Sequence, residues 1–286
     1  MTSKTQIIEA IFRSRWNEET KTLSSSIVTL LDAQEAISRF NSTQPKNPLS
    51  TRNPANFFKD FIRKQSRANA NWPPYVLKCG YTGRQLVSSG NCFEFIPLGN
   101  DARIAFSNDA LPLPDASTKH HRVESVSLPL ASKRLGRRDE PWLIQVLVKL
   151  RVFETHLALA SDQEIVQLDH LQTNIKLAGS EIDALFLGIK QPEGKSAREV
   201  IICCEAKGRK DDIIPDQILG QVKAAFKMGI EQDTVIPLAV KAIAPSEIWL
   251  VEFQPVDRAQ LSTLAALTVA TSAIYHLVPP VKGIGE

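Results

Sequence analysis

The sequence predicts an α/β protein with a mixed sheet flanked by helices, preceded by a smaller region of helices and a β-hairpin. After residue 140, segments with apolar residues at helical spacing alternate with apolar runs of strand length. Before residue 99, three helical patterns are followed by short apolar runs that turn residues separate. We therefore expect two domains, residues 1–98 and 141–286, joined by a linker or arm at 99–140.

The first domain is expected to contain three helices followed by a hairpin. Apolar stripes indicate helices near residues 7–12 and 27–37, the second of them after the cap candidates Ser24 to Ser26. Asn53 and Pro54 are typical of a third helix start. This helix would bury Phe57, Phe58, Phe61 and Ile62. Short strands are expected at residues 75–78, 84–87 and 92–96.

The linker is rich in proline and in basic residues, which are Pro112, Pro114, Pro129, Lys133, Arg134, Arg137 and Arg138. Such a segment either embraces a polyanion or is simply solvated. It also contains the adjacent pair His120 and His121, and two adjacent histidines alone do not predict a metal site.

The second domain alternates helices and strands in a definite order. Apolar spacing predicts a helix at residues 141–160, then strands at 164–177, 181–189 and 199–208. A helix at 215–229 opens after Asp211 and Asp212 with Pro215 in its first turn, and strands at 234–243 and 248–253 complete the sheet.

Charged residues of two neighbouring strands are expected to lie side by side in this domain. Glu205, Ala206 and Lys207 follow the apolar run 200–204, and Glu181 and Asp183 lie on the strand before it. Because alternate residues of a strand share a face, Glu205 points with Lys207 and Glu181 points with Asp183. Burying such charges costs several kcal/mol unless a partner or a metal compensates. The same tripeptide pattern at residues 19–21 and 193–195 follows no apolar run.

An acid followed about twenty residues later by Glu-x-Lys at a strand end resembles the PD-(D/E)XK nuclease superfamily. The resemblance covers roughly residues 140–260 and implies a restriction-endonuclease-like core. The first motif departs from the family name, since Ile182 stands where a proline would precede Asp183. The family also often has a metal-shell glutamate on its first helix, where Glu154 falls within an apolar stripe; alternatively, Glu154 caps the edge of that stripe or pairs with Arg151.

The resemblance implies a Mg²⁺ site, in which Mn²⁺ can substitute. Asp183, Glu205 and the backbone carbonyl of Ala206 would hold the ion. Lys207 would orient or deprotonate the attacking water and offset charge on the phosphorus. Beyond the motif, Arg209 and Lys210 would contact DNA phosphates. Gln217 and Gln221, four residues apart on one helix, would contact DNA or the metal surroundings, or form a solvated face.

Charge is divided unequally along the chain. Residues 1–140 hold 20 Lys and Arg against 13 Asp and Glu, a net charge of +7, and residues 141–286 have a net charge of −4. A basic half beside an acidic half suits a phosphate-binding module joined to a metal-binding one. Helices followed by a hairpin are typical of a winged helix, which would place Arg63, Lys64 and Arg67 of the third helix on DNA. The same segment also fits a scaffold packed on the sheet domain.

The remaining features predict a reduced, cytoplasmic protein that does not enter a membrane. The start of the chain lacks the apolar core of a signal peptide, and the apolar stretch 264–278 is too short and too interrupted to span a bilayer. The four cysteines form no CxxC pair.

The sequence thus predicts a Mg²⁺-dependent DNA endonuclease, a type II restriction enzyme acting as a homodimer on double-stranded DNA. The alternatives are a repair, recombination or mobile-element nuclease of the same fold, and a non-catalytic DNA-binding regulator.

Overall fold

The structure is a computed structural model of the 286-residue chain. It describes residues 2–44, 48–52, 54, 57–58, 65–86, 90–99, 104–106, 110–177, 180–228, 230–264 and 266–286. The chain divides into two compact units, residues 1–108 and 109–286, which are described separately below.

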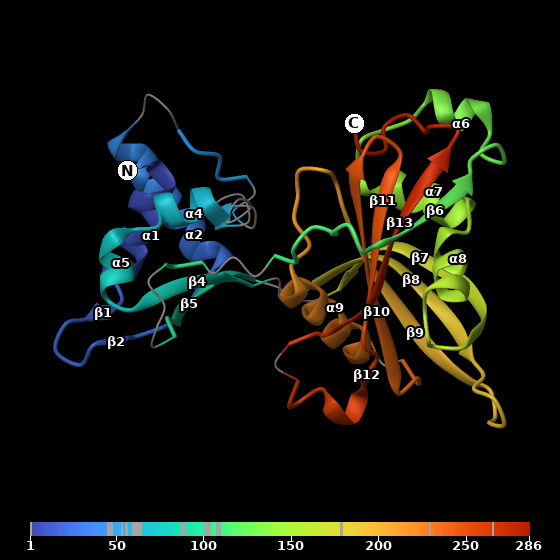
Figure 1. Cartoon of the computed structure of the whole chain (residues 1–286). Coiled ribbons are helices and arrows are strands. Elements are labelled where there is room, and N and C mark those ends of the chain that lie inside the picture. The colour runs from blue at the N-terminus through green and yellow to red at the C-terminus, as the bar shows by residue number, and fades with distance from the viewer. Residues whose placement is uncertain are drawn as a thin grey trace. The chain divides into compact units, whose positions relative to one another are not determined.

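The second unit is built on a large mixed sheet (Figure 1). Its strands are β6 (Lys119–Glu124), β7 (Ile165–Leu177), β8 (Ser180–Lys190), β9 (Arg198–Lys207), β10 (Thr234–Ala244), β11 (Glu247–Phe253), β12 (Val256–Asp257) and β13 (Val269–Val278). The spatial order is β6-β13-β11-β10-β9-β8-β7, with β12 paired to β10. The pairs β9 with β10 and β13 with β6 are parallel, and the other described pairs are antiparallel.

Helices cover both faces of this sheet, as Figure 1 shows. On one face, α7 (Glu140–Lys149) and α8 (Val152–Leu159) pack on the largest apolar cluster, and α9 (Pro215–Lys227) packs on the other face. The central strands β9 and β10 are therefore buried on both sides, which explains their nearly continuous apolar sequences. The short helix α6 (Leu130–Arg134) and a 3₁₀ turn at Arg258–Gln260 complete the unit. This confirms the expected α/β class with a mixed sheet flanked by helices.

Three expectations for the second unit were wrong in detail. The single helix expected at 141–160 is two helices, because Arg151 takes a left-handed conformation with φ of 51° and interrupts the helical path. Residues 119–124, assigned to the linker, form β6, which pairs with β13. The stretch 269–278 forms β13, a strand that sequence reasoning missed.

The first unit combines helices with small antiparallel sheets. Its elements are α1 (Ser3–Arg13), β1 (Trp16–Asn17), β2 (Thr22–Leu23), β3 (Ile27–Thr29), α2 (Leu30–Thr43), α4 (Gln65–Asn71), α5 (Pro74–Lys78), β4 (Tyr81–Gln85) and β5 (Asn91–Pro97). Strands β3, β5 and β4 pair in that order, and β1 pairs with β2. The core is aromatic, with Phe12, Phe58 and Phe93 fully buried and Phe58 stacked on Phe93 at 4.5 Å between ring centroids.

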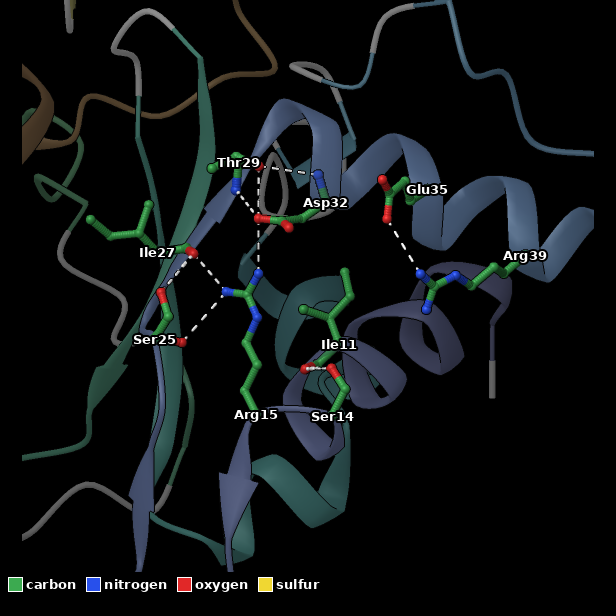
Figure 2. A network of polar contacts seen from close by, with 9 residues as sticks. All are labelled: Ile11, Ser14, Arg15, Ser25, Ile27, Thr29, Asp32, Glu35 and Arg39. Atoms are coloured by element: carbon green, nitrogen blue, oxygen red, sulfur yellow. Dashed lines mark hydrogen bonds and ion pairs between the residues drawn. The ribbon is translucent and has the colours of Figure 1, made fainter.

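The start of α2 is fixed by a polar network around Arg15, which Figure 2 shows. Thr29 is the N-cap and forms a capping box with Asp32, so the helix begins at Leu30 and not after the serines. The guanidinium of Arg15 contacts Asp32 at 2.8 Å and donates to the carbonyl of Ile27 at 2.6 Å. Arg15 thereby joins the start of β3 to the first turn of α2.

Two further expectations for this unit need correction or fall outside the described residues. Residues 75–78 form helix α5 instead of a strand, because Pro73 and Pro74 set a helical start. The third helix was expected to carry Arg63 and Lys64, which lie outside the described residues, as do Phe61 and Ile62. Within the described part, Phe57 and Phe58 are buried and Arg67 of α4 is exposed.

Candidate active site

Asp183 and the Glu205–Lys207 tripeptide meet at the end of two neighbouring strands. The antiparallel ladder between β8 and β9 reaches the pair Ala184 and Cys204. At the next position, the side chain of Asp183 accepts a hydrogen bond from the backbone N–H of Ala206 at 2.7 Å. The strand arrangement expected from the sequence therefore brings Asp183 directly against the tripeptide.

Glu205 is held at both of its carboxylate oxygens. Only 3% of Glu205 is exposed. One oxygen pairs with the ammonium of Lys207, two residues along the same face of β9, and the other accepts from the amide of Gln221 on α9. The Gln221 amide also donates to the backbone carbonyl of Glu181 at 2.8 Å. Glu205 is thus oriented by a lysine on its own strand and by the helix that covers this face.

The site carries an excess of negative charge. Burial, the carboxylate of Glu205 and that of Glu140 together raise the pKa of Asp183 to about 7. Burial by itself would lower the pKa of Lys207, but the adjacent Glu205 outweighs this effect and the pKa is raised. Two carboxylates therefore act on Asp183 beside Lys207, an environment that a bound cation would stabilise.

Glu140, which sequence reasoning missed, is the helical carboxylate that acts on Asp183 and Lys207. It lies in the first turn of α7, directly after the N-cap Asp139. The predicted helical acid, Glu154, lies on α8, where it is half-buried. Burial raises its pKa, and Arg151 acts on it as the opposite charge. The metal role of Glu154 and its pairing with Arg151 therefore both stay predictions.

The residues expected to contact DNA differ in their solvent exposure. Arg209, Lys210 and Gln217 are exposed, but Gln221 is fully buried and holds Glu205, so the direct DNA contact expected for Gln221 is wrong. The same role was predicted for Gln217 and Gln221 because they are four residues apart on one helix. The packing of α9 on the sheet buries Gln221 and leaves Gln217 exposed. Arg209 donates to the carbonyl of Gly285 at 3.3 Å and borders a cavity that Glu140 and Gly208 also line.

The donor set fits a hard divalent cation that retains water. In the described part of the chain, no three His, Cys, Asp or Glu side chains are grouped as ligands of one metal. Mg²⁺ is commonly bound by one or two carboxylates together with waters and substrate phosphate, so a three-residue cage is unnecessary. Asp183, Glu205 and the carbonyl of Ala206 would hold such an ion, with Glu140 beside them.

The chain matches no known protein-family model, no curated protein and no solved structure at a significant level. Among the described residues, we find no helix that combines the length and the apolar character needed to cross a bilayer. The residues of the site are therefore the basis of the function proposed below.

Proposed function

We propose that this chain is a Mg²⁺-dependent DNA endonuclease of the PD-(D/E)XK type. The observation that carries the proposal is the contact of Asp183 with the Glu205–Lys207 strand end, where burial and nearby like charge raise the pKa of Asp183 to about 7. The order of elements adds support, because α7 and α8 precede the meander β7-β8-β9, and α9 and β10 follow it. The restriction-endonuclease-like core and the winged-helix character of residues 1–98 are part of the same proposal.

Each residue of the site has a role in phosphodiester hydrolysis. Bound Mg²⁺ would supply an activated water and stabilise the leaving oxygen. Asp183 and Glu205 provide the negative charge that retains the ion, and Gln221 fixes the rotamer of Glu205. The ammonium of Lys207 forms an ion pair with Glu205. From there it would orient the attacking water and compensate negative charge on the phosphorus.

The first unit supplies the charge needed to retain DNA. Residues 1–108 contain 14 Lys and Arg against 8 Asp and Glu, whereas residues 109–286 contain 20 against 23. The proposed substrate is double-stranded DNA, and two copies of the chain would cut the two strands. Neutralising Arg63, Lys64 and Arg67 together should weaken binding and flatten its dependence on salt, by about one unit of log-log slope for each lost phosphate contact. An unchanged slope would place this segment away from DNA.

The competing function is a non-catalytic DNA-binding regulator. Digestion of plasmid DNA with Mg²⁺ and with chelator distinguishes the two functions. Discrete fragments indicate a restriction enzyme, whereas smearing or loss from ends indicates a repair, recombination or mobile-element nuclease. A mobility shift without cutting in Mg²⁺ or Mn²⁺ would contradict the proposal.

A reducing cytoplasm, where such enzymes meet DNA, suits the four free cysteines.

A further inference from the structure

Two histidines that are far apart in the sequence meet on strands β6 and β13. Nδ1 of His120 lies 2.7 Å from Nε2 of His276, and the two rings are stacked with 5.0 Å between their centroids. In the parallel pairing of these strands, His120 is opposite Ile274, and His276 lies two residues further along the same face. In the sheet of Figure 1, β13 lies between β6 and β11, and β11 and β10 separate β13 from β9.

A carboxylate orients the second histidine from the next strand. Glu247 of β11 is directly opposite His276 in the antiparallel ladder, and its Oε1 lies 3.4 Å from Nδ1 of His276. A carboxylate at this nitrogen favours a proton on Nδ1 and leaves the lone pair on Nε2. With the proton on Nδ1 of His276, its Nε2 would accept from the Nδ1–H of His120 across the 2.7 Å contact in the metal-free protein.

We propose that His120 and His276 form a binding site for a borderline divalent cation of the Zn²⁺, Ni²⁺ and Cu²⁺ class. Nitrogen ligands lie about 2.0–2.1 Å from such ions, so two of them at 90° to 110° are about 2.9–3.4 Å apart. To bind such an ion, the two nitrogens must separate by a few tenths of an ångström from the observed 2.7 Å, and both rings must turn so that their lone pairs converge on the ion instead of lying along the line between the nitrogens. His120 is exposed and the His276 side chain is 29% exposed, so both rings can make this movement.

Metal binding replaces the proton that lies between the two histidines with the ion. Nδ1 of His120 gives that proton to solvent and Nε2 of the same ring takes one up, so both imidazoles stay neutral and each offers a lone pair. Water completes the coordination, because the described residues contain no grouping of three or more His, Cys, Asp and Glu ligands. Arg122, opposite His276 in the strand register, opposes the added charge, and Glu247 favours it. Imidazole nitrogen selects these ions over Mg²⁺ and Ca²⁺, which prefer oxygen.

This site is independent of the proposed nuclease activity. Its ligands are nitrogen instead of oxygen, and β13 is separated from β9 by two strands. Occupancy would join the edge strand β6 to β13 through a metal bridge, in addition to their backbone hydrogen bonds.

The test uses the full-length chain titrated with NiCl₂ in a calorimeter, and with CuCl₂ under electron paramagnetic resonance. We expect one Ni²⁺ to bind per chain. We expect the Cu²⁺ spectrum to show hyperfine coupling to two imidazole nitrogens. His120→Ala and His276→Ala should each weaken Ni²⁺ binding at least tenfold, and Glu247→Gln should weaken it about tenfold through loss of the orienting carboxylate. His170→Ala is the matched control, because His170 is also exposed on an edge strand, and it should change nothing.

Two results would overturn the inference. One is Ni²⁺ affinity that stays the same in both His120→Ala and His276→Ala. The other is Ni²⁺ binding that Asp183→Ala removes and the histidine variants leave intact, which would place the ion at the carboxylates. Absence of Mg²⁺-dependent cleavage in the wild type would refute the nuclease proposal alone and leave the Ni²⁺ result valid.

Discussion

Asp183→Asn should stabilise the metal-free protein while abolishing its activity. The pKa of Asp183 is raised from 3.8 to about 7 in the fold, a shift of roughly 3 pH units. At 1.36 kcal/mol per unit, the ionised carboxylate costs the folded state about 4 kcal/mol at pH 8. Asparagine has the same shape and keeps an oxygen to accept from the backbone N–H of Ala206, so it removes the charge and retains the contact.

The sign of the pH dependence follows from the same shift. Because the folded pKa lies above the unfolded one, the folded state holds a proton between about pH 4 and pH 7 that the unfolded state has lost. Stability of the wild type therefore falls as pH rises through this window, and the full penalty applies above it. The advantage of Asp183→Asn should be about 4 kcal/mol at pH 8 and about 2 kcal/mol at pH 5.

Thermal unfolding of the second unit in chelator, followed by circular dichroism, measures this difference. We expect Asp183→Asn to raise the Tm by roughly 5–15 °C at pH 8, and Glu181→Gln, an exposed acid on the same strand, to leave it unchanged. Mg²⁺ should stabilise the wild type and have no effect on Asp183→Asn. A lower Tm for Asp183→Asn at pH 8 would refute the charge-repulsion argument.

Three other predictions follow from the packing of the molecule and from its ligand chemistry. Gln221→Leu should destabilise the protein by about 2–3 kcal/mol in urea unfolding, because it leaves the buried Glu205 oxygen without a donor, whereas Gln217→Ala on the exposed face should have little effect. Arg15→Ala should cost about 1–3 kcal/mol by breaking the contact between β3 and α2, and Arg39→Ala, whose side chain is 82% exposed, should cost under about 0.5 kcal/mol. Equal losses within either pair would contradict the contacts described. Ca²⁺ should support DNA binding measured by fluorescence anisotropy without supporting cleavage, because it activates bound water less than Mg²⁺ does, and full cleavage in Ca²⁺ alone would contradict this difference between the two ions.

The core of the candidate site could be predicted because its geometry is local. Glu205 and Lys207 share a face of one strand through the alternation of side chains, and Asp183 lies on the strand that precedes it in a meander. The apolar residues of β9 and β10 also revealed a fully buried centre of the sheet.

Contacts set by tertiary packing were not predictable. Glu140 acts on Asp183 because the start of α7 lies near the start of β8, although 43 positions separate the two residues. The burial of Gln221 depends on which face of α9 meets the sheet, and the helical spacing of Gln217 and Gln221 is the same for either face. Strand β6 lies between proline-rich segments and is polar at most positions, so its pairing with β13 has no local signal.

The most direct test of the central claim is single-turnover cleavage of duplex DNA in Mg²⁺, with DNA affinity measured in parallel in Ca²⁺. The wild type should cut, and Asp183→Ala and Lys207→Ala should each lose at least about a hundredfold in rate while their DNA affinity remains. The matched control is the exposed Glu-x-Lys of the β8–β9 turn, where Glu193→Ala and Lys195→Ala should cut at the wild-type rate. Near wild-type cutting by Asp183→Ala, or undiminished cutting in chelator, would contradict the assignment of this strand end as a metal-dependent nuclease site.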